Sequence, residues 1–541
     1  MVRTRFAPSP TGYLHVGGLR TALYSFLFAR KNNGKFLLRI EDTDQKRFVE
    51  GAVDNLLKTL EWCGITYDEG PNKDGGSKGI AYRAPSEAGS GGVGPYVQSE
   101  RTEIYRKHAE ILLEKGTAYR CFCTPERLEE MRERQTKLKQ APMYDRACLK
   151  LSKEEIDAKI KEGVPFVIRQ KIPHGQKLMF KDLVRGIVTF DSNTIDDQVL
   201  MKSDNFPTYH LANVVDDHLM EISHVIRGEE WLPSTPKHIF LYQDFGWKPP
   251  EFAHLPLLLN KDKTKLSKRQ GDVSVEDYIQ KGYSREAIIN FIAMLGWHPG
   301  SGVEQEMFTI DELIEKFSIE QIHKAGAVFD LEKLNWFSFQ WNKRKYTEKL
   351  EQLAKEVEST CQITISEKQE KIFKFSTPEK EKMFTEVRGE LLYEMAKQYL
   401  PAGWRDQAVR LQKSLITIEE KILKTTSESA INMKFFFETS PINTALLLNP
   451  KMKVEKEHAL NALQKSREAL TKLGNFENVE EIKKCLLEVV TALGYKNGQV
   501  FWPVRVALTN EPFTPGVFEV IWALGKEETL KRLQEAEKQL G

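Results

Sequence analysis

The chain has 541 residues, more than one ordinary hydrophobic core accommodates, so the sequence predicts several domains. Hydrophobic residues make up 40% of it, which excludes a disordered protein, and the net charge of +2 excludes a uniformly basic nucleic-acid coat. The longest apolar runs, such as residues 255–259, are too short to cross a bilayer, and the first motif begins at Arg3, leaving no room for a cleavable leader. We therefore expect a cytoplasmic protein that does not enter a membrane.

The first forty or so residues alternate between strand and helix patterns. A short strand is predicted over residues 4–7. Apolar residues then recur at helical spacing over 19–27 and stop before Asn33 and Gly34. The apolar run 36–40 is typical of a strand buried in a parallel sheet. Strand, helix and strand in this order predict a nucleotide-binding βαβ unit of Rossmann type.

The rest of the chain changes character three times. Residues 70–95 are rich in Gly, Ser and Pro and predict a surface loop. Residues 101–200 mix helix and strand patterns, which indicates an inserted α/β domain, and the first pattern resumes with a helix from Thr208 and a strand over 221–226. From about Phe329 onward, helical periodicity and dense charge predict an all-α region.

The segment 5–18 leads from a strand through a Pro- and Gly-rich loop into a helix. A helix start offers backbone N–H groups and the positive end of the helix dipole, which suit a phosphate. Gly17 and Gly18 allow a nucleotide to approach the backbone closely, and His15 is suited to donate a hydrogen bond to a phosphoryl oxygen as charge develops there. The competing interpretation is a Pro/Gly turn capping a helix, beside an ordinary surface histidine.

A second motif, at 263–269, reads Lys-Thr-Lys-Leu-Ser-Lys-Arg. Cations on a loop suit a pyrophosphate leaving group. Alone, the heptapeptide is equally typical of a solvated basic loop.

Together, the two motifs resemble the signature sequences of class I aminoacyl-tRNA synthetases. Four segments are similar to bacterial-type glutamyl-tRNA synthetases in particular: 5–12, 39–44, 207–218 and 225–231. The similarity is dense from Val2 to about Leu334 and looser beyond. It implies that glutamate and ATP, with Mg²⁺, form glutamyl-adenylate and pyrophosphate. It also implies transfer of glutamate to the 3′-terminal adenosine of tRNA(Glu).

The resemblance implies three groups of site residues. Those of the glutamate pocket would be Arg5, Ala7, Ser9, Glu41, Tyr209, Asn213 and Arg227. Those in contact with ATP would be Thr11, Gly12, His15, Gly17, Gly18, Glu230, Trp231, Leu258, Lys265, Ser267 and Lys268. The transition-state charge would be stabilised by His15, Lys265 and Lys268.

The chemistry of the first group fits glutamate, which carries two carboxylates and an ammonium. Arg5 and Arg227 are natural bidentate partners of carboxylates, and which arginine takes the side-chain carboxylate stays open. Glu41 follows the carboxyl end of a strand, where open α/β sheets bind ligands, and suits the ammonium. Tyr209 and Asn213 lie four apart at a helix start and share a face. The competing interpretation of each residue is a structural ion pair or a core tyrosine.

Of the six cysteines, three cluster in the inserted region. Cys121 and Cys123 are followed by Tyr144 and Cys148, a spacing that suits one structural Zn²⁺ remote from the chemistry. Some glutamyl-tRNA synthetases carry zinc here with a later Cys-x-His, but Lys150 stands where that histidine would be. The alternative is three small buried thiols in a metal-free insert.

The resemblance also implies a domain organisation. We expect a Rossmann catalytic domain at 1–104 and 208–255, split by an acceptor-end-binding domain at 105–207. A stem-contacting region at 256–340 and helical anticodon-binding domains at 341–541 follow, in a monomer. Candidate RNA contacts in the last region are Lys413, Lys421, Lys424 and Lys434, with Trp404 and Phe436 as exposed aromatics, although for each residue a solvated helix face is the competing interpretation. Ser414 aligns where the family often has an Arg that reads the anticodon's third base, which leaves charging of tRNA(Gln) open.

Three other functions remain to be weighed. Arg227 argues against a glutaminyl-tRNA synthetase, since a second arginine suits a carboxylate better than an amide. An adenylyl transferase for a small metabolite would not need two hundred additional helical residues. A non-catalytic tRNA-binding relative would not need His15, Lys265 and Lys268.

Overall fold

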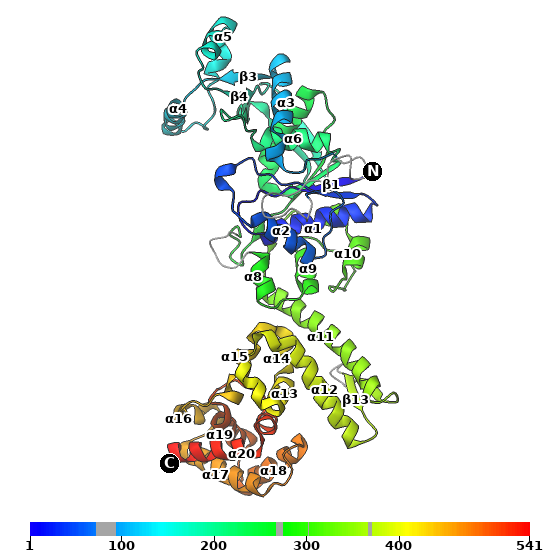
Figure 1. Ribbon diagram of the computed structural model, residues 1–541. Coiled ribbons are helices and arrows are strands. Elements are labelled where there is room, and N and C mark those ends of the chain that lie inside the picture. The colour runs from blue at the N-terminus through cyan, green and yellow to red at the C-terminus, as the bar shows by residue number, and fades with distance from the viewer. Residues whose placement is uncertain (72–92, 267–273, 301, 366–370) are drawn as a thin grey trace. The chain divides into compact units, whose positions relative to one another are not determined.

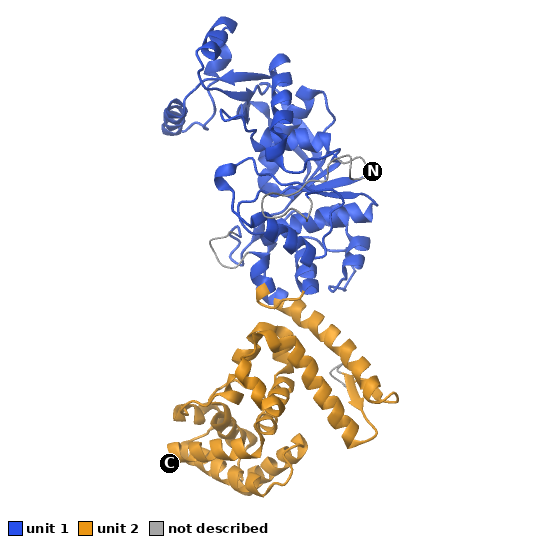
Figure 2. Cartoon of the chain, viewed as in Figure 1, with its two compact units in different colours: residues 1–279, 285–334 blue, residues 280–284, 335–541 orange. Residues whose placement is uncertain are grey.

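The computed structural model describes residues 1–71, 93–266, 274–300, 302–365 and 371–541 (Figure 1). Most of the loop predicted at 70–95 lies outside these ranges, as do Ser267 and Lys268 of the basic motif. The chain forms two compact units (Figure 2). Unit 1 comprises Met1–Ile279 with Arg285–Leu334, and unit 2 comprises Gln280–Ser284 with Asn335–Gly541.

The predicted βαβ unit is present in unit 1. Strands β1 (Arg3–Phe6) and β2 (Lys35–Leu38) pair in parallel, and helix α1 (Val16–Lys31) connects them. The chain returns to this sheet some 220 residues later, where the Ser223 N–H donates to the Arg3 carbonyl at 3.0 Å, just before β8 (His224–Gly228). Strand β9 (Glu251–Leu255) then pairs in parallel with β8. Since parallel neighbours point the same way, the carboxyl ends of β1 and β2 share one edge of the sheet.

The inserted region contains two antiparallel arrangements of strands. The first is a sheet in the order β3–β4–β7, formed by Ala118–Cys121, Val167–Gln170 and Val199–Met201. The second is the hairpin of β5 (Lys177–Asp182) and β6 (Gly186–Asp191). Strand β5 also pairs in parallel with β9 at Asp182 and Phe252, so the hairpin extends the sheet of β8 and β9. The helices of this region are α3 (Thr102–Glu114), α4 (Pro125–Lys137) and α5 (Lys153–Lys161).

The other helices of the first 334 residues are α2 (Ala52–Trp62), α6 (Tyr209–Leu219), α7 (Thr235–Phe245), α8 (Val275–Gln280), α9 (Arg285–Ala293) and α10 (Ile310–Lys316). A short parallel pair, β10 (Leu258–Leu259) and β11 (Ala327–Val328), precedes the long helix α11 (Leu331–Val357).

Unit 2 is helical and has a core of its own. Its further helices are α12 (Pro378–Ala396), α13 (Ala408–Thr417), α14 (Glu419–Lys424), α15 (Ser429–Phe437), α16 (Thr444–Leu447), α17 (Lys456–Lys472), α18 (Val479–Leu493), α19 (Asn497–Thr509) and α20 (Val517–Leu540). The region predicted as all-α also contains an antiparallel pair, β12 (Gln362–Ile365) and β13 (Lys371–Lys374).

Two predicted RNA-stacking residues of unit 2 are core residues instead. Trp404 is 8% exposed and stacks on Phe437 with 4.4 Å between ring centroids, and Phe436 is fully buried. Ser414 is fully buried as well. A buried side chain cannot stack on or contact a base, so the prediction of exposed aromatics at these positions is wrong. Among the helices in the described ranges, none combines the length and the apolar character needed to cross a membrane.

Candidate active site

A cavity of about 900 Å³ lies beside the carboxyl ends of β1, β2 and β8. All the residues predicted for the glutamate pocket line it. So do the following predicted ATP-site residues: Thr11, Gly12, His15, Gly17, Gly18, Glu230 and Trp231. The fold thus gathers segments that are more than 200 residues apart in the chain around one hollow.

The remaining predicted residues are not part of the described cavity wall. Leu258 is buried at the start of β10, and a Cβ placed on Gly17 would lie 3.7 Å from its Cδ1, so it sits next to the start of α1. Lys265 is exposed, with its backbone bridged to Leu259. Ser267 and Lys268 lie outside the described residues.

The start of α1 is capped by the predicted phosphate-binding histidine. His15 is the N-cap residue, and its Nδ1 accepts a hydrogen bond of 2.9 Å from the Gly17 N–H. This amide is therefore already satisfied and is not one of the free N–H groups that a helix start is expected to offer a phosphate. Because Nδ1 accepts, the neutral imidazole carries its proton on Nε2, which is the tautomer that a phosphoryl oxygen requires.

Beneath the cavity, arginines and carboxylates form a buried network. Asp217 is 1% exposed and accepts from Arg5 Nε at 3.0 Å and from Arg39 Nη1 at 2.8 Å. Arg39 Nη2 also donates to Glu41 Oε1 at 2.9 Å. The Asn213 Oδ1 accepts from both Arg5 and Arg39, so its amide can serve a ligand only through Nδ2. The network fixes the two predicted ligand-binding residues, Arg5 and Glu41, relative to each other.

Burial and pairing act in opposite directions on these acids. Burial raises the pKa of Glu41 despite the attraction of Arg39. Burial also acts to raise the pKa of Asp217, but Arg5 and Arg39 outweigh it and hold that pKa below its ordinary value. Arg39 and Asp217 lie in the segments 39–44 and 207–218 that resemble the family, but sequence reasoning gave them no role. The available signal was a charged residue at the end of the apolar run 36–40 and another on the apolar helix 209–219.

Aromatic side chains form another part of the wall. The rings of Tyr209 and Trp231 lie 4.4 Å apart between centroids, and the Tyr209 hydroxyl accepts from Arg227 Nη1 at 3.0 Å. The Glu230 side chain is exposed and its carboxylate folds over Gly228. This part of the wall combines a flat aromatic surface with a cation.

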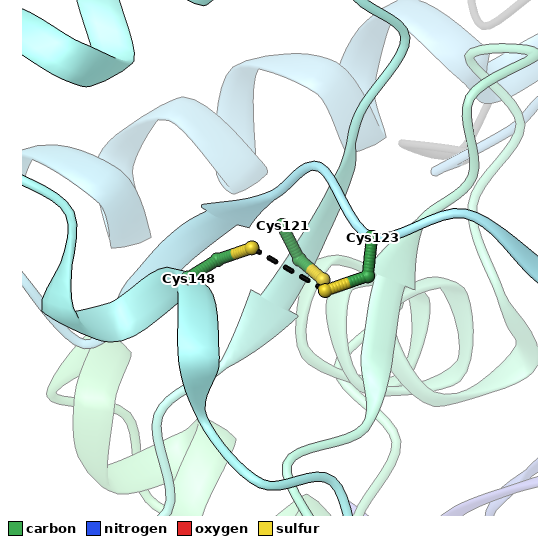
Figure 3. A group of neighbouring side chains, drawn as sticks. All are labelled: Cys121, Cys123 and Cys148. Atoms are coloured by element: carbon green, nitrogen blue, oxygen red, sulfur yellow. Dashed lines mark hydrogen bonds between the residues drawn. The ribbon is translucent and has the colours of Figure 1, made fainter. Parts of the chain in front are cut away.

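Three of the four predicted metal ligands, the cysteines, meet in the inserted region (Figure 3). The sulfurs of Cys121, Cys123 and Cys148 all lie within 4.8 Å of one another. The Tyr144 hydroxyl is 3.3 Å from the sulfurs of both Cys121 and Cys123, and Cys123 is 3.5 Å from Cys148, sulfur to sulfur. Hydrogen bonding with Cys148 lowers the pKa of Cys121 to about 4, which favours a thiolate. The group is a candidate metal site.

Comparison with known proteins matches both halves of the chain. The family of class I tRNA synthetases (E and Q), catalytic domain, matches residues 1–336, and the anticodon binding domain family matches 391–537. The glutamate–tRNA ligase of Chloroherpeton thalassium is 47% identical over 99% of this chain and 97% of its own length. That of Pelodictyon phaeoclathratiforme is 46% identical over 98% and 97%.

This chain belongs to the glutamate–tRNA ligase family. A solved glutamate tRNA ligase from Elizabethkingia meningosepticum, in complex with its amino acid, is 34% identical, covers 100% of both chains and superposes with a TM-score of 0.73. Membership of the family confirms the resemblance drawn from the sequence motifs. It also confirms the fold class, a class I catalytic domain followed by a helical anticodon-binding region.

Proposed function

We propose that this chain is a glutamate–tRNA ligase, which activates L-glutamate with ATP and transfers it to tRNA(Glu). The observation that carries the proposal is the single cavity that unites the His15 loop with Arg5, Glu41 and Arg227. Two arginines and one acid match the two carboxylates and one ammonium of glutamate. Near full-length identity of 46–47% to curated ligases of this name supports the same activity.

The chemistry needs positioning more than proton transfer. The α-carboxylate of glutamate attacks the α-phosphorus of ATP, and pyrophosphate leaves. A hydroxyl of the terminal adenosine of tRNA then attacks the acyl carbon, and AMP leaves. A carboxylate is already a nucleophile, so the protein's task is alignment and charge stabilisation. In the proposal His15 Nε2–H, Lys265 and Lys268 stabilise the phosphoryl charge, and Mg²⁺ accompanies ATP.

The test is ATP–pyrophosphate exchange with glutamate and with glutamine, each with and without tRNA. We expect exchange with glutamate that depends on added tRNA, and none with glutamine. Exchange with glutamine would favour a glutaminyl-tRNA synthetase. No exchange with either amino acid would favour a non-catalytic tRNA-binding relative.

The second part of the proposal concerns the RNA. We assign residues 105–207 to the acceptor end, 256–340 to the stem and 341–541 to the anticodon, in a monomer of the cytoplasm. The anticodon-binding match at 391–537 supports the last assignment. Deletion of 341–541 should abolish charging of tRNA, and unchanged charging would contradict the RNA role of these residues.

The third part is one structural Zn²⁺ held by Cys121, Cys123, Cys148 and Tyr144. In a tetrahedral site with Zn–S bonds of about 2.3 Å, neighbouring sulfurs lie about 3.8 Å apart, close to the 3.5 Å between Cys123 and Cys148. In the proposal Tyr144 is the fourth ligand, in place of the histidine that some family members have where this chain has Lys150. Bound zinc would tie the strand that ends at Cys121 to the turn at Cys148.

Metal analysis of the purified chain should therefore find about one zinc per chain. Cys148→Ser should lower that content and the unfolding temperature, whereas Cys485→Ser, a cysteine of unit 2 outside the cluster, should change neither. Far less than one zinc per wild-type chain would exclude the metal.

A further inference from the structure

The guanidinium of Arg227 has an unusual environment for a buried cation. The residue is 5% exposed, yet no described carboxylate lies within 4.0 Å of it. By contrast, Arg5, which lines the same cavity, pairs with Asp217, and so does Arg39. A buried cation without a counter-ion is costly unless its N–H groups are satisfied and a negative ligand completes the site.

Neutral acceptors contact all three nitrogens of the Arg227 guanidinium instead. Nε donates to His254 Nε2 at 3.1 Å. Nη1 donates to Tyr209 Oη at 3.0 Å and to His238 Nδ1 at 3.3 Å. Nη2 donates to Thr235 Oγ1 at 2.9 Å and to the Trp231 carbonyl at 3.5 Å. These acceptors fix the plane of the Arg227 guanidinium without neutralising its charge. The guanidinium is thus oriented before any ligand arrives.

The tautomer of one of these acceptors, His254, is fixed by its second hydrogen-bond partner, Asp182. Arginine only donates, so His254 Nε2 must offer a lone pair to Arg227 Nε. The proton of the neutral ring therefore sits on Nδ1, where it meets Asp182 Oδ2 at 2.6 Å. Asp182 is held in turn by three backbone N–H groups: its Oδ1 accepts from Val184, Arg185 and His254 at 3.0, 2.8 and 3.3 Å. All three side chains of this relay are nearly or fully buried.

The tautomer of His238, on the Nη1 side of the guanidinium, is fixed in the same way. His238 Nδ1 accepts from Arg227, so its Nε2 carries the proton and donates to His210 Nδ1 at 3.1 Å. Three histidines are thereby held as defined neutral tautomers around one cation. If a hydrogen-bond donor replaced any of these acceptors, it would face an N–H of Arg227, and the guanidinium would have to reorient.

We propose that Asp182 and His254 are positioning residues for amino-acid binding: Asp182 sets the tautomer of His254, and His254 holds Arg227 aligned for a carboxylate of the substrate. This inference rests on the proposed function, in which Arg227 binds glutamate. Both residues act through Arg227 and contact no reacting atom. Sequence patterns do not mark either residue, since Asp182 and His254 lie on β5 and β9, outside every motif.

Replacing Asp182 with Asn keeps the size of the side chain but changes the tautomer that it imposes on His254. Asparagine keeps an oxygen for the three backbone N–H groups, but its Nδ2 donates to His254 Nδ1 and moves the imidazole proton to Nε2, against Arg227. We expect Asp182→Asn to raise the KM for glutamate about tenfold or more, with kcat and the KM for ATP changed less than threefold. One misdirected hydrogen bond to a charged group is of this size.

A pair of variants at His254 provides a second measure. Glutamine places an oxygen near the position of Nε2, so His254→Gln should stay within about threefold of the wild-type KM for glutamate, while His254→Leu should resemble Asp182→Asn. The matched control is His224→Gln, a half-buried histidine of β8 bonded to Ser223 and remote from Arg227 in the hydrogen-bond network. It should leave every constant unchanged.

The outcomes separate this inference from the proposed function. A wild-type chain without glutamate-dependent exchange refutes the proposed function. A working wild type with an unchanged KM in Asp182→Asn, or equal KM values in His254→Gln and His254→Leu, refutes only the positioning role. If the variants do not fold, ¹⁵N-histidine NMR of the wild type decides: a proton on Nδ1 of His254 supports the relay, and a proton on Nε2 overturns it.

Discussion

Asp217 holds two guanidinium groups, those of Arg5 and Arg39, at a position where water cannot replace it. Asp217→Asn would leave both cations buried with one carboxylate fewer. Breaking a buried pair in this way costs about 3 kcal/mol or more of unfolding free energy. We expect that loss in denaturant titration, together with a rise of at least tenfold in the KM for glutamate because Arg5 loses its anchor.

The control for this change is Glu468→Gln, which removes an exposed partner of Lys465 on α17. Exposed ion pairs contribute little, so this variant should match the wild type in both measurements. Equal stability of Asp217→Asn and the wild type would mean that the buried network is dispensable.

The histidines around Arg227 make stability depend on pH. Burial lowers the pKa of His254 to about 4 and of His210 to about 3, and lowers that of His238 as well. The unfolded chain titrates near 6.5, so it binds more protons than the folded chain below that pH. The stabilisation is complete above pH 6.5 and is lost as the pH falls, by roughly 2 kcal/mol at pH 5 for His254 alone.

Denaturant titrations at pH 7, 6 and 5 should therefore show falling stability of unit 1. Burial raises the pKa of Asp244 to about 6 and raises that of Glu41, which acts in the opposite direction, but it also lowers the pKa of His218 and His224. The variant His210→Gln should reduce the slope. Stability that stays level or rises from pH 7 to pH 5 would contradict the neutral state of these histidines.

At the scale of secondary-structure elements, local patterns in the sequence were a reliable guide. Helix α1 ends at Lys31, just before the predicted stop at Asn33 and Gly34, and β1 and β2 lie within one residue or two of the predicted strands. Their signals are periodicity and stop residues within a few positions, and these act locally. The motif residues of the cavity were likewise found because they lie in continuous segments.

What escaped prediction depends on contacts between distant segments. The pairs Arg5–Asp217 and Asp182–His254 join residues 212 and 72 positions apart, and nothing local marks them as partners. Exposure of single aromatics was misjudged for a similar reason. Whether Trp404 faces water depends on where Phe437 packs, which a helical pattern alone does not specify.

The start of α1 contains a glycine, Gly17, where helix propensity favours alanine. A Cβ on Gly17 would lie 3.3 Å from His15 Nδ1, tighter than ordinary contact. Gly17→Ala should thus displace the capping imidazole and lower kcat/KM for ATP by about tenfold, although alanine favours a helix by roughly 0.5–1 kcal/mol. Exchange kinetics and thermal unfolding measure the two effects separately.

Gly403→Ala is the matched control, because a Cβ on Gly403 meets nothing within 4 Å and the residue lies in unit 2. It should leave the kinetics unchanged. Wild-type kinetics in Gly17→Ala would show that the glycine serves neither His15 nor the nucleotide.

At the scale of the whole molecule, each unit buries its own apolar side chains. The core of unit 2 draws on residues 346–540, and the cavity is lined by residues of unit 1 alone. A chain built in this way need not unfold in one step. We expect calorimetry of the full chain to resolve two transitions. ATP at about 100 times its Kd should stabilise unit 1 by roughly 2.7 kcal/mol and raise the temperature of one transition only. Sodium sulfate at matched ionic strength should not reproduce that selective shift. A single transition that moves as a whole with ATP would instead mean that the two cores unfold as one cooperative unit.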